Sequence, residues 1–162
     1  MVMVDIERND FNAALNRARQ LVQIGEKLRE GSEAPLARAL IHLCNYALSG
    51  DDQGLDQALG QLRDADAKQR LAYILNRTAL LDIGFNRPEQ AVIHAREALE
   101  YAELLERTSD RILSHVVLAQ AAQLNQAPTV SAEHLAALTE LVSAPAAVWA
   151  KTRANRLLNE SE

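Results

Sequence analysis

The stretch Tyr73–Glu106, which reads YILNRTALLDIGFNRPEQAVIHAREALEYAELLE, decides the fold of this chain. Its first part is an apolar helical segment that ends at Gly84, and a second helical segment follows a polar turn. Within the turn, Asn86 is a residue type that caps helices, and Pro88 has its φ angle preset for a first helical turn. The pattern therefore predicts a helical hairpin.

A second turn of this kind occurs at Gly50, which lies 34 residues before Gly84. A spacing of about 34 residues is typical of proteins built from repeated helix pairs. Asp51, Asp66 and Asn86 are the expected helix caps after successive turns. Working outward from the turns, we predict no strands and about eight helices, at residues 10–30, 32–49, 51–65, 66–83, 86–106, 108–125, 131–142 and 145–160.

The third predicted helix contains Gly54 and Gly60. Each glycine costs up to about 1 kcal/mol relative to alanine inside a helix. We therefore expect residues 51–65 to form the least stable helix of the chain.

The segment 86–91, followed by Ala98-Leu99-Glu100, resembles the second helix of a tetratricopeptide repeat. Gly84 lies near the turn glycine of that family, and Tyr46 lies near its first-helix tyrosine. The resemblance extends over roughly residues 36–142 and implies an array of antiparallel α-hairpins in a right-handed superhelix. The first helix of each pair would line a groove. An irregular all-helical bundle remains the alternative, because its alanine-rich helices would share much of the pattern.

The length of 162 residues suits one domain, 1–162. We expect an N-terminal helix at 10–30, three helix pairs within 34–142, and a C-terminal capping helix at 145–160. Helices at the two ends of such a stack cover apolar faces that would otherwise be exposed.

Charge and cysteine content limit the classes of function. The net charge of −5 argues against nucleic acid as a partner, because phosphate neutralisation requires a basic face. The single cysteine, Cys44, fits a reducing compartment. No apolar run reaches the length of about 20 residues that crosses a membrane, and residues 1–5 lack the basic and apolar segments of a signal peptide. We therefore expect a cytoplasmic protein that has no membrane partner.

Residues that could carry catalysis or bind a metal do not form a motif. The four histidines, His42, His94, His115 and His134, do not have the His-x-x-x-His spacing that places two metal ligands on one helix face. The sequence also contains no glycine-rich phosphate loop and no nucleophile elbow. We therefore expect no catalytic residues, no metal and no cofactor.

Polar residues on the expected first helices are the candidate binding residues. Aligned by the repeat, His42, Asn76 and His115 fall at similar places and could point into the groove, where they would bind peptide backbone or a carboxylate. Arg77 and Arg111 could supply contacts to anions. The alternative is that all five occupy ordinary solvent-facing positions.

Trp149, the only tryptophan, is the candidate interface residue, although it could instead pack the last helix onto the array. Together these features predict a non-catalytic module that binds a peptide or a partner protein, in a groove or through its end helices, with a homodimer as one possibility. The long second helix at 86–106 suggests an alternative, because slightly longer repeats of this kind occur in bacterial signalling ATPases and transcription regulators. In that case the chain would be a regulatory or sensor domain.

Overall fold

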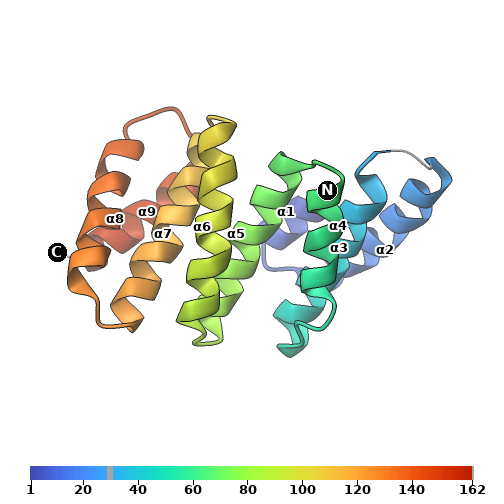
Figure 1. Ribbon diagram of the computed structural model, residues 1–162, viewed down its shortest axis with the longest axis horizontal. Helices are drawn as coiled ribbons and strands as arrows, with labels where there is room; N and C mark the ends of the chain where they lie inside the picture. The colour runs from blue at the N-terminus through green and yellow to red at the C-terminus, as the bar shows by residue number, and fades with distance from the viewer. Residues whose placement is uncertain (29–30, 162) are drawn as a thin grey trace. The chain divides into compact units, whose positions relative to one another are not determined.

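The computed structural model describes residues 1–28 and 31–161. In these two ranges the backbone forms nine α-helices and no strand, which confirms the predicted all-α class (Figure 1). The predicted helix end near Glu30 lies outside the described residues. In chain order the helices are α1 (Val2–Glu7), α2 (Phe11–Leu28), α3 (Glu33–Ser49), α4 (Leu55–Asp64), α5 (Lys68–Gly84), α6 (Pro88–Leu104), α7 (Thr108–Leu124), α8 (Pro128–Leu141) and α9 (Val148–Glu160).

Successive helices pack as antiparallel hairpins, as predicted for a helical repeat array. The helices fall into two compact units, with the boundary between Ile74 and Leu75. This boundary lies inside α5 and not in a linker.

In the first unit, α2 packs against α1 and α3, and α3 packs against α4. Gly25 lets α2 approach the start of α3, because a Cβ atom at this position would lie 2.7 Å from the backbone nitrogen of Ala34. The Arg70 guanidinium fixes the start of α5 against the start of α3. It donates hydrogen bonds of 2.7 Å to Ser32 Oγ and of 2.7 Å to Glu33 Oε1.

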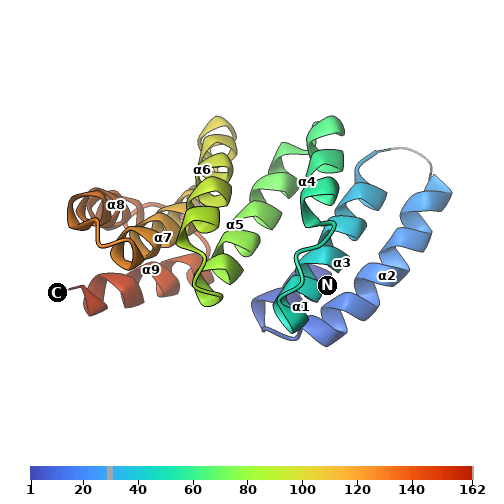
Figure 2. The same cartoon turned by 60° about the horizontal axis from the view of Figure 1, so that its bottom comes forward.

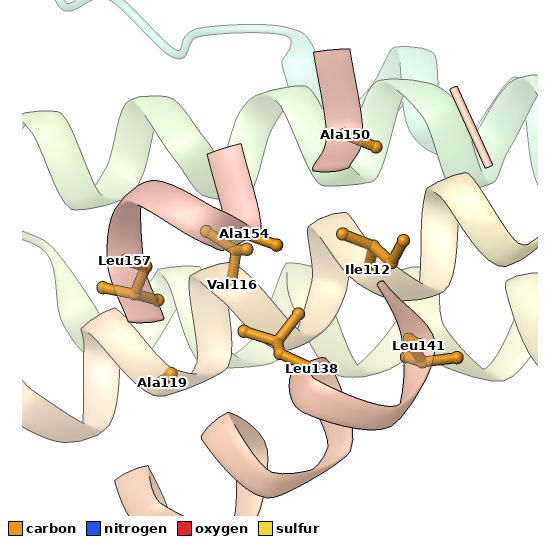
Figure 3. Packing of buried hydrophobic residues seen from close by; sticks show 8 residues of the cluster. All are labelled: Ile112, Val116, Ala119, Leu138, Leu141, Ala150, Ala154 and Leu157. Carbon is orange, nitrogen blue, oxygen red and sulfur yellow. The ribbon is translucent and has the colours of Figure 1, made fainter. Parts of the chain in front are cut away.

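In the second unit, α7 is the central helix and packs against α6, α8 and α9, with α9 lying alongside it (Figure 2). Leu138 of α8 points toward α7 in the cluster that α7, α8 and α9 form (Figure 3). On the other side of α7, small residues permit close packing. The side chains of Ala91, Ala95 and Ala98 on α6 are fully buried. The C-terminal helix therefore covers an apolar face, as the sequence predicts.

The four helices α5, α6, α7 and α8 begin at residues 68, 88, 108 and 128, so that each helix starts 20 residues after the one before it. The predicted 34-residue period is therefore wrong for this part of the chain. The spacing of 34 between Gly50 and Gly84 arises because α4 is short, with only 10 residues, whereas α5 has 17.

One turn geometry joins these helices. The residues with left-handed backbone are Asp66, Asn86, Glu106 and Gln126, with φ values of 49°, 56°, 52° and 53°. In each turn, the N–H of the following residue donates to the carbonyl five residues earlier, as Ala67 does to Leu62 and Arg87 does to Asp82. This is the pattern of the Schellman motif, which satisfies carbonyls at a helix end. The repeat is thus set by a C-terminal cap that does not use glycine.

These turns correct several predicted caps. Gly50 does end α3 in the left-handed conformation, with φ of 71°. Gly84, however, is the last residue of α5, and the left-handed residue of that turn is Asn86. Asp66 likewise belongs to the end of α4 and does not cap α5. In both cases a residue type that favours helix caps also tolerates positive φ, and the second property is the one used here.

The region of the third predicted helix differs at its start. Asp51 accepts a 2.9 Å hydrogen bond from the backbone N–H of Gln53, but α4 begins only at Leu55. Gly54 is the residue before the helix and has φ of 80°. The chain therefore makes a separate turn at 50–54 before α4, where helix was predicted.

The two glycines near α4 should respond in opposite ways to alanine. Gly54→Ala should destabilise the protein by about 1–2 kcal/mol, because a Cβ in left-handed backbone is strained and would lie 2.6 Å from His42 Cε1. Gly60→Ala should stabilise it by about 0.5–1 kcal/mol, since Gly60 is inside α4 and a Cβ there would meet no atom within 4 Å. Urea unfolding followed by far-UV circular dichroism measures both changes. Shifts of the same sign would contradict this account of the turn.

The sequence analysis did not predict α1. This six-residue helix is too short to be stable alone and depends on its contacts with α2. Ile6 is buried, and Asp5 forms an ion pair with Arg17 of α2. Residues 1–6 are rich in valine and isoleucine and carry no capping residue, so that local sequence gives no helix signal here.

Candidate functional site

His42, the one predicted site residue in the first unit, contacts the turn before α4. Its Nδ1 lies 3.0 Å from the carbonyl oxygen of Gln53 and can donate a hydrogen bond to it. The half-buried ring also occupies the space beside Gly54. His42 therefore has a structural role in holding this turn against α3.

Asn76 on α5 is fully buried and faces α7. Its Nδ2 donates a 3.1 Å hydrogen bond to the carbonyl oxygen of Asp110, and its Oδ1 lies 2.9 Å from Ser114 Oγ, which can donate to it. The prediction that Asn76 points into an open groove is therefore wrong. Its amide groups are used within the protein, because a buried amide without partners would be costly.

Arg77 and Trp149 contact each other. The Arg77 guanidinium lies over the Trp149 ring, 4.9 Å from its centroid, which is a cation–π geometry. Arg77 is buried and Trp149 is half-buried. The contact joins α5 to α9 within the second unit and favours the packing alternative for Trp149 over the interface role.

Two histidines, one of them a predicted site residue, form a close pair between α7 and α8. The Nδ1 atoms of His115 and His134 lie 3.1 Å apart, and the ring centroids are separated by 5.3 Å. One ring must donate its Nδ1–H to the Nδ1 of the other. Arg111, another predicted site residue, precedes His115 by four positions on α7 and so lies on the same helix face.

Burial and nearby charges keep the histidine pair neutral. Burial, assisted by His134 and Arg111, lowers the pKa of His115 to about 4. Burial likewise lowers the pKa of His134, where Arg96 also lowers it and Glu133 opposes the shift. Two cations and a single carboxylate thus act on the pair.

The sequence analysis missed the contribution of Arg96 and did not pair His134 with His115. A signal was present in the helix lengths. Arg96 is the ninth residue of α6, His115 the eighth of α7 and His134 the seventh of α8. Antiparallel helices of similar length that are joined by short turns place their middles opposite one another. The helix boundaries would therefore have brought these side chains together, had the 20-residue spacing been recognised.

Other reactive groups are sequestered. Cys44 is buried, and burial raises the pKa of its thiol to about 11, which makes it an inert thiol. Asp82 Oδ2 and His94 Nδ1 form a buried pair at 2.7 Å. Among residues 1–28 and 31–161, no three His, Cys, Asp or Glu side chains are grouped so as to hold a metal ion. None of the described helices is long and apolar enough to cross a membrane.

An open depression of about 380 Å³ lies at the turn between α7 and α8. Its walls come from the end of α7, the start of α8 and the end of the chain, and include Gln123, Gln126, Pro128, Ser131, Leu135 and Ser161. It is shallow and carries no charged side chain. The histidine pair with its two arginines is the more specific candidate site.

The chain matches no protein-family model, and comparisons with curated proteins and with solved structures also find no match. What the fold defines is an all-helical protein whose helices pack in sequential antiparallel pairs.

Proposed function

We propose that this chain is a non-catalytic, tetratricopeptide-like interaction module that binds a peptide or a partner protein on the surface of α6, α7 and α8. The carrying observation is the grouping of Arg111, His115 and His134 on neighbouring helices. Arg111 makes no hydrogen bond or ion pair within the described residues, and its buried Nε has no acceptor there. A buried donor that lacks an acceptor is costly, so a bound partner would offset a defect in the free protein.

Apolar side chains beside this group support the same surface. Ile93, which is 57% exposed, lies one helical turn before Arg96 on α6, and Leu104 further along α6 is 64% exposed. Large exposed apolar residues next to polar groups are common at protein interfaces. The 20-residue helix spacing departs from the tetratricopeptide period, so the likeness to that family lies in hairpin stacking and not in repeat length.

A position-specific cross-linking experiment tests this function. A photoreactive benzoylphenylalanine in place of Ala137, which lies one turn after His134 on α8, should yield a discrete cross-linked protein in cells that express the chain. The same amino acid in place of the exposed Asn155 on α9 is the control and should yield none. Absence of a product at Ala137, or equal products at both positions, would reject an interaction surface here. A product between two copies of the chain would identify self-association as the interaction.

A further inference from the structure

Arginines in the second unit follow a pattern with two exceptions. Within residues 75–161, five of the seven arginines have a partner; these are Arg77, Arg87, Arg107, Arg153 and Arg156. Arg96 and Arg111 have no hydrogen bond or ion pair with any described residue. In a chain with a net charge of −5, acidic groups are abundant. Two arginines without an acidic partner at one place are therefore informative.

Both exceptions act on the same histidine pair. Arg111 is one helical turn from His115 on α7, and Arg96 occupies the middle of α6, level with the middles of α7 and α8. The charged groups that shift the titration of the pair are Arg96 from α6, Arg111 from α7 and Glu133 from α8. Glu133 is exposed and forms no ion pair with either histidine. Positive groups from three helices thus converge without a bound anion.

We propose that Arg96, Arg111, His115 and His134 form a binding site for an oxyanion, which is a carboxylate or phosphate group carried by the partner. This inference rests on the proposed function and names the chemical group that the surface recognises. Guanidinium groups bind both kinds of oxyanion through parallel N–H donors. The histidine rings add further N–H donors once they are protonated.

Binding should be coupled to proton uptake. In the free protein, the low pKa values of both histidines keep the pair neutral near pH 7. An anion beside the rings favours their charged form and raises these pKa values. Because the complex then binds more protons than the free protein, affinity for the anion must rise as the pH falls from 8 to 6.

The test follows the imidazole resonances of the full chain by NMR at constant ionic strength. Two probes are titrated, inorganic phosphate and a hexaglutamate peptide, at pH 6 and at pH 8. We expect His115 and His134 to shift with at least one probe, with about three- to tenfold higher affinity at pH 6. The probe that binds more tightly identifies which oxyanion the site prefers. Shifts with neither probe would overturn the proposal.

Variants separate this site from general attraction to a positive surface. The double variant Arg96→Gln/Arg111→Gln should lose about tenfold or more in affinity. The control Arg156→Gln, which removes an equally charged but exposed side chain on α9, should retain it. Circular dichroism checks that each variant is folded, and the single variant Arg96→Gln serves if the double variant does not fold. Equal binding by the Arg96 and Arg156 variants would refute the site.

The two proposals can fail separately. A cross-linked partner that persists in a folded Arg96→Gln/Arg111→Gln variant would leave the interaction function standing and refute the oxyanion site. Oxyanion binding that disappears in that variant, in a chain that cross-links to no protein, would have the opposite meaning.

Discussion

Leu138→Ala should destabilise the second unit by about 3 kcal/mol, within the range of 2–5 kcal/mol for buried leucines. Leu138 lies on α8, has no exposed surface, and points toward Val116 of α7 (Figure 3). The same cluster includes Ala154 and Leu157 of α9. Truncation would leave a cavity where three helices meet, and helix packing relaxes only in part around such a cavity.

The unfolding transition can be followed by the fluorescence of Trp149, which packs against this cluster and is the only tryptophan in the chain. Urea titration of the wild type and the variant gives the difference in free energy of unfolding. Leu104→Ala is the matched control, because Leu104 is 64% exposed on α6 and its loss should cost less than about 0.5 kcal/mol. A loss below 1 kcal/mol for Leu138→Ala, or equal losses for both variants, would show that the three helices do not share this core.

Helix positions were predictable in this chain because its apolar spacing and its turns are local signals. The start of α6 at Pro88 and the left-handed end of α3 at Gly50 follow from single residues with restricted or unusual backbone freedom. The true spacing of the later helices was less accessible. It depends on Schellman turns at Glu106 and Gln126, where glycine is the usual residue and neither side chain gives a sequence signal.

The candidate site was only partly predictable, because its members come from three helices. His115 and Arg111 could be proposed from their helix face alone. Their association with His134 and Arg96 depends on where α6 and α8 begin, and the start of α8 lies at Pro128, three residues before the predicted start at Ser131. A polar residue on a helix face also does not show whether it faces solvent or a neighbouring helix. Asn76 illustrates the second outcome.

Asn76→Asp should destabilise the second unit by about 3 kcal/mol at pH 7, because it replaces a buried, hydrogen-bonded amide with a carboxylate. The new oxygen would face the carbonyl of Asp110, to which Asn76 Nδ2 now donates. Ser114 Oγ could still donate to one carboxylate oxygen, but a single hydrogen bond does not offset the burial of a charge.

The pH dependence distinguishes this cause from a simple change of shape. Burial raises the pKa of an introduced carboxyl group above its unfolded value, so the folded variant holds its proton to higher pH than the unfolded chain does. The loss of stability should therefore be small near pH 4 and grow as the pH rises to 7. Urea unfolding of both proteins at several pH values, followed by Trp149 fluorescence, measures this difference. The exposed Asn155→Asp on α9 should change stability by less than about 0.5 kcal/mol at every pH. If Asn76→Asp behaved in the same way, Asn76 would be open to solvent and would again be a candidate for binding a partner.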